Sequence, residues 1–414
     1  MEPLFTIDDA YIALQHFYVH NFEETFEVIP GVTAKLRVAG HILGSATVYL
    51  VIEENGKKTT MIFFFFLGQP KQPIVEDPSV LSGADFIITE STYGNRKHKA
   101  YDKEEELARI INETVERGGN VVIPAFAVGR TQVLLYYFQK LTQEGKIPDV
   151  PIYVDSPLAT KATGITLANK EEYDEETRAL VEFQGDRLFA MKNVHFTPTP
   201  EESRMINGIE GSKIILSASG MADAGRILHH LKHNLWRPEC SVVFAGYQAE
   251  GTMGRNLIDG VKKVKIMGET IHVAAEIVNM TGFSAHADKE QLLEWYKKMP
   301  HKPKIFFVTH GEFDSSSALA KDLQMQLGTA TYIPKYGDSV EISGAEYTIE
   351  AAPEVESLPE VAELQDSIAI IERNYMQYKN KMEQIALRDS GKAEQMRRKL
   401  EKVRRYMDDM LGNL

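Results

Sequence analysis

Three histidines stand in small-residue turns that directly follow apolar segments, and imidazoles in such places can bind a metal ion. His41, His286 and His310 each have a glycine or an alanine as a direct neighbour. Zinc binds imidazole nitrogen readily, and a hydrolytic zinc lowers the pKa of its bound water to about 7. The three histidines therefore allow a shared zinc site. Three unrelated loop histidines are the alternative, which the spacing alone leaves open.

Glu90 ends an apolar segment, residues 85–89, and is followed by two hydroxyl residues. A carboxylate at such a place can accept a hydrogen bond from an imidazole and fix the orientation of the ring. The alternative is a carboxylate that only caps a turn. Glu90 is thus a candidate partner for one of the histidines.

Several loops that follow apolar segments carry polar side chains and glycine. Ligands usually bind at the carboxyl ends of parallel strands, and backbone N–H groups at a helix start favour phosphate oxygens. Residues 129–131 and 217–221 have this character and together indicate a channel that could follow a phosphate backbone. A pair of ordinary strand-to-helix turns is the alternative. The candidate substrate-binding residues of these and neighbouring loops are Arg130, Ser217, Ser219, Gly220, Gln248 and Ser284.

The other histidines have no comparable context. His229, His230 and His233 form a group that we expect on the solvated surface of a helix. We take His98 as structural. None of these residues is assigned to the site.

The elements that must position these residues change character along the chain. Asn55 and Gly56 predict a hairpin turn between two early strands. From about residue 101, short apolar strands alternate with helices, which predicts a parallel sheet with right-handed crossovers. Expected strands cover residues 33–38, 46–52, 58–66, 85–89, 120–124, 151–155, 213–216, 241–245, 275–280 and 305–308. Expected helices cover residues 7–22, 102–117, 129–144 and 289–296. The strands 275–280 and 305–308, which precede His286 and His310, are expected to be neighbours.

The tail of the chain has a heptad pattern of apolar residues over 364–385 and again over 396–410. We expect a helical hairpin or short coiled coil there, joined to the rest by a linker that starts at residue 353. Lys and Arg crowd residues 392–405. That charge indicates either a solvated helix face or a contact to RNA or to another chain.

The composition of the 414-residue chain is that of an ordinary globular protein, with 43% hydrophobic and 25% charged residues. No apolar run approaches the roughly 18 residues of a membrane span, so we expect no membrane partner. The only cysteine, Cys240, fits a reducing cytoplasm. The net charge of −13 argues against indiscriminate nucleic-acid binding but leaves room for a local basic channel.

Six blocks, in their order and spacing, resemble the β-CASP branch of the metallo-β-lactamase superfamily, whose members are largely zinc-dependent ribonucleases or related nucleic-acid hydrolases. The blocks are residues 40–46, 90–94, 124–130, 217–221, 283–288 and 310–312. The resemblance runs from about residue 3 to residue 352 and implies an α/β fold. We expect the second half of an αββα metallo-β-lactamase domain (1–97), an inserted β-CASP parallel-sheet domain (98–280), a return to the first domain (281–352), and a C-terminal linker with a helical hairpin (353–414).

The resemblance also implies roles for the candidate residues. His41 and His310 would each bind one of two zinc ions. His286 would contact the scissile phosphate and help the leaving oxygen, and Glu90 would hold His286. The β-CASP domain would close a cleft over RNA.

Two departures from the family pattern concern the metal ligands. The His-x-His-x-Asp-His motif is absent from this sequence, which suggests a chain that begins after it. The position of the bridging aspartate is Phe66, which has no lone pair to offer a metal. With His41 and His310 alone, two ligands remain where a catalytic zinc normally has three protein ligands. We therefore expect that this chain alone does not assemble a dinuclear zinc site.

Two functions follow, and the sequence leaves both open. The first is an RNA-cleaving hydrolase that is incomplete or inactive as a single chain: a fragment, a product of a misplaced gene start, or one half of a split enzyme with a complementing chain. A homo-oligomer is a further possible assembly. The second is a non-catalytic subunit that binds RNA or a partner. A small-molecule metallohydrolase fits the superfamily but not the β-CASP blocks.

Overall fold

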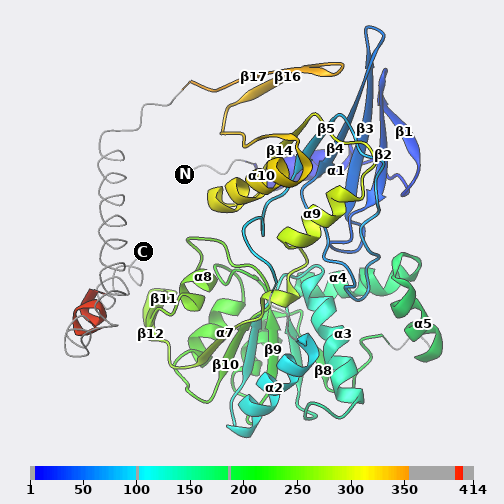
Figure 1. Ribbon diagram of the computed structural model, residues 1–414. Helices are drawn as coiled ribbons and strands as arrows, with labels where there is room; N and C mark the ends of the chain where they lie inside the picture. Colours follow the sequence, from blue (N-terminus) through cyan, green and yellow to red (C-terminus); the bar gives the residue numbers. More distant parts are fainter. Residues whose placement is uncertain (1–4, 99–101, 185–187, 354–396, 404–414) are drawn as a thin grey trace.

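The computed structural model describes residues 5–98, 102–184, 188–353 and 397–403. A seven-stranded sheet and a six-stranded sheet dominate it and lie at opposite ends of Figure 1. Parallel strands with crossover helices confirm the expected α/β fold. Residues 397–403 are helical, and the rest of the predicted helical hairpin lies outside the described residues.

The seven-stranded sheet has the order β1-β2-β3-β4-β5-β14-β15. Its first four strands pair antiparallel, and the pairs from β4 to β15 are parallel. Asn55 and Gly56 have positive φ values of 52° and 73° at the predicted hairpin turn between β3 and β4. The strands are β1 (Thr25–Ile29), β2 (Val32–Val38), β3 (Ala46–Glu54), β4 (Lys57–Phe64), β5 (Phe86–Thr89), β14 (Ile305–Val308) and β15 (Ala330–Tyr332).

Strand β4 shows why this sheet has two different faces. Ile62 and Phe64 point to one face and pack against helices α9 (Lys289–Lys297) and α10 (Phe313–Leu327). Met61 belongs to the cluster on the other face, which the hairpin of β16 (Ser339–Ser343) and β17 (Glu346–Glu350) joins. Because side chains alternate along a strand, one apolar run serves both cores. Residues 61–64 of this run are thus inside the sheet.

The six-stranded sheet has the order β13-β10-β6-β9-β7-β8, and all its pairs are parallel. Its strands are β6 (Val121–Pro124), β7 (Ile152–Asp155), β8 (Val194–Phe196), β9 (Ile214–Ser217), β10 (Ser241–Phe244) and β13 (Glu276–Asn279). Two apolar clusters fill its two faces, one with residues of α2 (Lys103–Glu116), α3 (Arg130–Gln143) and α5 (Glu175–Gln184), the other with residues of α7 (Ile227–Asn234) and α8 (Met253–Ile258).

The remaining elements are short. They are α4 (Pro157–Ala168), α6 (Pro200–Ile206), the hairpin of β11 (Lys263–Ile266) and β12 (Glu269–His272), and two 3₁₀ turns, Lys170–Glu172 and Thr281–Phe283. The strands that precede His286 and His310 were predicted to be neighbours. This prediction is wrong, because β13 belongs to the six-stranded sheet and β14 to the seven-stranded sheet.

The first helix is shorter than predicted. Helix α1 covers Ile7–Leu14 rather than residues 7–22, and none of its residues is buried. Eight large apolar side chains of residues 5–19 are more than half exposed, so this end of the chain carries an exposed apolar surface. In the part of the chain that the structure describes, no helix combines the length and apolarity needed to cross a membrane.

Candidate functional site

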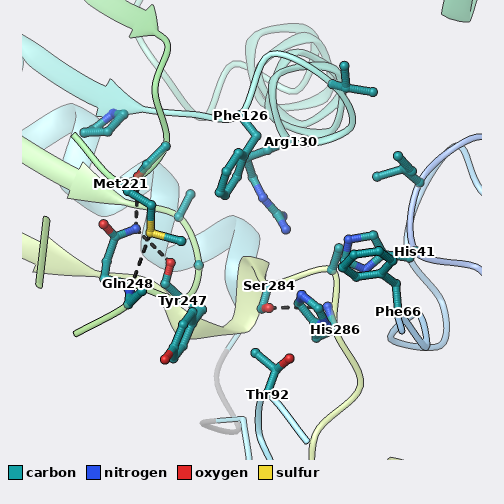
Figure 2. A pocket seen from close by; sticks show the side chains of 18 of the residues that line it. His41, Phe66, Thr92, Phe126, Arg130, Met221, Tyr247, Gln248, Ser284 and His286 are labelled. Carbon is teal, nitrogen blue, oxygen red and sulfur yellow. Dashed lines mark hydrogen bonds between the residues drawn. The ribbon is translucent and has the colours of Figure 1, made fainter. Parts of the chain in front are cut away.

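A cavity of about 780 Å³ is lined by loops from both sheets. Figure 2 shows side chains that line it, among them His41, Arg130, Gln248 and His286, arranged around one space. The loops follow the carboxyl ends of β2, β4, β6, β9, β10, β13 and β14, which is where α/β proteins usually bind ligands. The structure thus brings these predicted site residues together: His41, Arg130, Gly220, Gln248, Ser284, His286 and His310.

His286 and Glu90 form a pair at the base of the cavity. Glu90 is fully buried, and its Oε2 lies 2.7 Å from Nδ1 of His286. Its Oε1 accepts a hydrogen bond of 2.6 Å from the backbone N–H of Leu67. Because Nδ1 donates to the carboxylate, the neutral ring carries its proton there, and Nε2 remains as the acceptor. The carboxylate therefore orients His286 and also ties two strand ends together.

Three side chains that the sequence did not single out hold the turn that carries His286. The amide nitrogens of Gln69 and Gln72 donate to the backbone carbonyls of Ser284 and Ala285, each at 3.0 Å. Nε2 of His98 lies 2.9 Å from the carbonyl oxygen of His286. His98 thus belongs to the support of the site, a role that its own neighbourhood in the sequence gave no reason to expect.

Arg130 places a buried cation beside the cavity. Its side chain extends into the cavity in Figure 2, yet the residue is only 8% exposed. One terminal nitrogen, Nη1, is buried without a hydrogen-bond partner, and no carboxylate among the described residues forms an ion pair with the guanidinium. Burial lowers the pKa of Arg130 to about 10, so it stays charged at neutral pH. An unpaired buried cation is costly, and an anion that enters the cavity would compensate it.

Helix α3, which starts at Arg130, approaches the His41 loop closely. Its N-cap is Gly129, which has a φ of 80°. A Cβ atom at this position would lie 2.4 Å from Cγ2 of Ile42. Only glycine both adopts a positive φ readily and has no Cβ atom, so Gly129 allows the two walls of the cavity to come together.

The loop after β9 contributes less to the cavity than predicted. Ser217 is 2% exposed and donates its hydroxyl hydrogen bond to the carbonyl of Asp155 at 3.0 Å, so it supports the sheet. Ser219 does not line the cavity either. The two serines thus lie outside the lining of the cavity, and their predicted contacts with a substrate stay predictions. Gln248 uses its amide nitrogen to hold Gly220, at 3.0 Å from that carbonyl.

Asp155 is the centre of a buried network under that loop. Its Oδ2 lies 2.7 Å from Nε2 of His230, and it also accepts hydrogen bonds from Ser203, Thr197 and Arg226. Burial alone would raise the pKa of Asp155, but these hydrogen bonds outweigh it and hold the pKa at about 2. His230 is fully buried, so the prediction of a solvated surface is wrong for it.

One link crosses from the six-stranded sheet to the seven-stranded sheet at the cavity rim. The Tyr247 hydroxyl, after β10, donates a hydrogen bond to the Glu312 carboxylate, after β14. Arg255 lies 3.9 Å from the same carboxylate. Burial and this hydrogen bond raise the pKa of Tyr247, so the hydroxyl keeps its proton. This link fixes the spacing of the two walls.

Beside His286, an aromatic ring lies among the imidazoles of the cavity. The ring centroid of Phe66 lies 5.0 Å from that of His41, 5.0 Å from that of His310 and 5.8 Å from that of His286. Nδ1 of His41 is buried without a hydrogen-bond partner, and burial lowers the pKa of His41 to about 2, which keeps it neutral. His310 has a φ of 45°, a left-handed conformation that non-glycine residues adopt mainly under local constraint.

This donor set does not fit two zinc ions. Both oxygens of Glu90 are engaged, and Phe66 presents carbon to the three imidazoles. Over the described ranges, no group of three or more His, Cys, Asp or Glu side chains is arranged to hold a metal ion. A closely spaced pair of zinc ions needs anionic ligands to offset their repulsion, and a catalytic zinc normally has three protein ligands.

Comparison with known proteins gives the family of the chain. A family described as the Beta-Casp domain matches residues 131–257, and one described as the Zn-dependent metallo-hydrolase RNA specificity domain matches residues 270–334. Ribonuclease TTHA0252 of Thermus thermophilus is 33% identical over 342 residues, which are 82% of this chain and 76% of that protein. The RNase J-like protein of Methanocaldococcus jannaschii is 33% identical over 333 residues, 80% of this chain and 76% of that protein.

A further relative carries a different name. Transcription termination factor FttA of Methanosarcina mazei is 31% identical over 334 residues, which are 77% of this chain and 52% of that protein. The chain thus spans about half the length of this factor. On the strength of these similarities, the chain belongs to the β-CASP, RNA-processing branch of the metallo-β-lactamase superfamily.

Proposed function

We propose that this chain binds single-stranded RNA in the cavity between its two sheets and does not cleave it through a dinuclear zinc centre. The family acts on RNA, and its matched portion includes an RNA specificity domain. The observation that carries the proposal is the ring of Phe66 among the imidazoles, where the family resemblance implies a metal-bridging carboxylate.

Arg130 supplies the main contact to the RNA backbone in this proposal. A guanidinium can donate two parallel hydrogen bonds to one phosphate, and burial strengthens the attraction. His286 has Nε2 free on a ring that Glu90 orients, so it can contact the same phosphate. The contact between a guanidinium and a phosphate releases counterions and is therefore sensitive to salt, while the net charge of −13 confines the attraction to this cavity.

An exposed aromatic ring in the cavity wall favours single-stranded over double-stranded RNA. Phe126 is 49% exposed and lines it, and unpaired bases stack on such rings. A duplex would keep its bases inside and leave this ring exposed to water. We therefore expect weaker binding of double-stranded RNA.

The test measures the binding and the integrity of a fluorescent oligoribonucleotide with the full chain. We expect anisotropy to report binding that is equal in EDTA and in zinc, and denaturing gels to show intact RNA. Arg130→Gln should weaken the affinity at least tenfold and flatten its salt dependence. Lys192→Gln, a surface change away from the cavity, is the control. Binding that EDTA abolishes, or cleavage by the wild-type chain, would contradict the proposal.

A second candidate is an RNA-cleaving hydrolase, which the intact Glu90–His286 pair favours. A carboxylate that fixes an imidazole tautomer is of direct use in proton transfer. The discriminating variant is Phe66→Asp, which returns a carboxylate to the cavity. Cleavage by this variant in zinc or manganese, together with an inactive wild type, would show that the missing carboxylate is the main defect of the chain.

A further inference from the structure

Phe66 is exposed in an unusual place. It is 42% exposed, whereas Phe64, two residues earlier in the same segment, is 1% exposed. Phe66 is one of the residues that line the cavity. A large apolar ring that stays open inside a cavity is typical of a surface that a ligand covers.

The ring of Phe66 is held on several sides. It stacks on His41 with an interplanar angle of 30° and meets His310 nearly edge-on, at 80°. Figure 2 shows the His41 and Phe66 rings superimposed at the cavity wall. These contacts restrict the rotamers of Phe66 before any ligand binds, so a flat ligand would lose less entropy on stacking there.

A second exposed ring comes from the other sheet. Phe126, in the loop after β6, lines the same cavity, and its ring packs so closely on Gly220 that a Cβ there would lie 2.8 Å from it. The Arg130 guanidinium extends into the space between this ring and the pair of His41 and Phe66 in Figure 2. The cavity thus offers two aromatic surfaces and one buried cation.

We propose that Phe66, with His41 and His310 around it, is a stacking site for one unpaired nucleobase of a single-stranded RNA whose phosphate contacts Arg130. The inference rests on the proposed RNA binding and adds a base-recognition site that uses the imidazoles as aromatic neighbours rather than as metal ligands. A phosphate at Arg130 and a base on Phe66 match the two parts of one nucleotide. Phe126 is then available to the next base along the strand.

The experiment follows one base directly. A short oligoribonucleotide that carries 2-aminopurine at a central position is titrated with the full-length wild type and three variants. The fluorescence of this base is quenched when it stacks on an aromatic ring. The variants are Phe66→Ala, Phe66→Trp and Phe183→Ala, the last a matched control because Phe183 is 90% exposed on helix α5 and does not line the cavity. Thermal unfolding of each protein checks that it is folded.

The expected result is a loss of affinity of roughly 5- to 100-fold in Phe66→Ala, together with a loss of quenching. Phe66→Trp should retain both, and Phe183→Ala should behave as the wild type. Tight binding by a Phe66→Ala protein with unchanged quenching would overturn the stacking site and leave the proposed RNA binding intact. Equal losses in Phe66→Ala and Phe66→Trp would also overturn it, because they would indicate a structural effect. If the wild type binds no RNA at all, the proposed function fails first and this inference with it.

Discussion

Two adjacent parts of the cavity wall, with the ring centroids of His286 and His41 only 4.5 Å apart, differ in what their side chains do for the fold. On one side, Glu90 accepts hydrogen bonds from both His286 and the backbone of Leu67. On the other, His41 has a buried nitrogen without a partner, and Phe66 contributes only ring contacts. The first side is tied into the sheets by polar contacts, and the second is packed around an aromatic ring.

The difference shows which residues of such a site stabilise the fold when no metal is bound. A buried carboxylate with two donors stabilises the fold whether or not the site reacts, because its removal leaves both donors unsatisfied. A metal ligand has no comparable role once the metal is gone, since its charge is then a cost. An aromatic residue such as Phe66 removes that cost and keeps the cavity walls in contact.

The largest effect is expected on the polar side. Glu90→Ala should lower the free energy of unfolding by about 3–5 kcal/mol, because it leaves a buried imidazole and a backbone N–H without an acceptor. Urea unfolding measures it. Phe66→Leu is the matched change on the other side and should cost about 1 kcal/mol. Equal losses in the two variants would remove the distinction between the two sides.

The close approach of the two walls can be tested at Gly129. Gly129→Ala should destabilise the chain by about 2–3 kcal/mol, since the new Cβ combines positive φ with a clash against Ile42. Gly118 has a φ of 74° and open space around its Cβ position, so Gly118→Ala isolates the cost of the backbone conformation, about 1 kcal/mol. If the two variants unfold at the same urea concentration, the walls are not in contact in solution.

A pH dependence is expected from Lys103, whose Nζ donates to Gln69 behind the His286 turn. Burial lowers the pKa of Lys103 from 10.5 to about 8, so between these values the unfolded chain binds a proton that the folded chain does not. The contribution of this residue to stability is therefore unfavourable at pH 7 and improves as the pH rises from about 8 to 10.5.

Lys103→Met should remove that pH dependence and stabilise the chain at pH 7 by on the order of 2 kcal/mol. Urea unfolding at several pH values compares the variant with the wild type. Lys161→Met, at an exposed position of helix α4, is the control and should leave the slope unchanged. A wild-type stability that does not rise above pH 8 would mean that Lys103 is solvated.

The smallest effect is expected at the rim. Tyr247→Phe removes the hydrogen bond to Glu312 that joins the two sheets and should cost about 1 kcal/mol. A double-mutant cycle with Glu312→Gln separates the pair from its surroundings. A coupling energy near zero would show that the rim does not hold the walls at their spacing.

Local sequence signals predicted the elements better than their assembly. The turn at Asn55 and Gly56 and the helix predicted over residues 102–117 were found because turn residues and an amphipathic pattern act within a few residues. Helix α1 was predicted too long, since apolar residues continue beyond Leu14 without forming helix. The strands β13 and β14 were wrongly predicted to be adjacent, because the sheet to which a strand belongs depends on pairing partners far away in the chain.

The site itself was predicted only in part for the same reason. His41, His286 and His310 could be chosen by their turns, and Phe66 by its departure from a family block. Gln69 and His98 act through backbone carbonyls more than 180 residues away, and no local pattern marks such contacts. The serines after β9 had the right composition for phosphate binding, but the sheet turns Ser217 inward.

The most direct test of the central claim is the zinc content of the purified chain. The wild type and Phe66→Asp are incubated with excess zinc, dialysed and analysed by inductively coupled plasma mass spectrometry. The account predicts less than one zinc per molecule in the wild type and a higher content in Phe66→Asp. A wild-type chain that retains close to two zinc ions per molecule would contradict it.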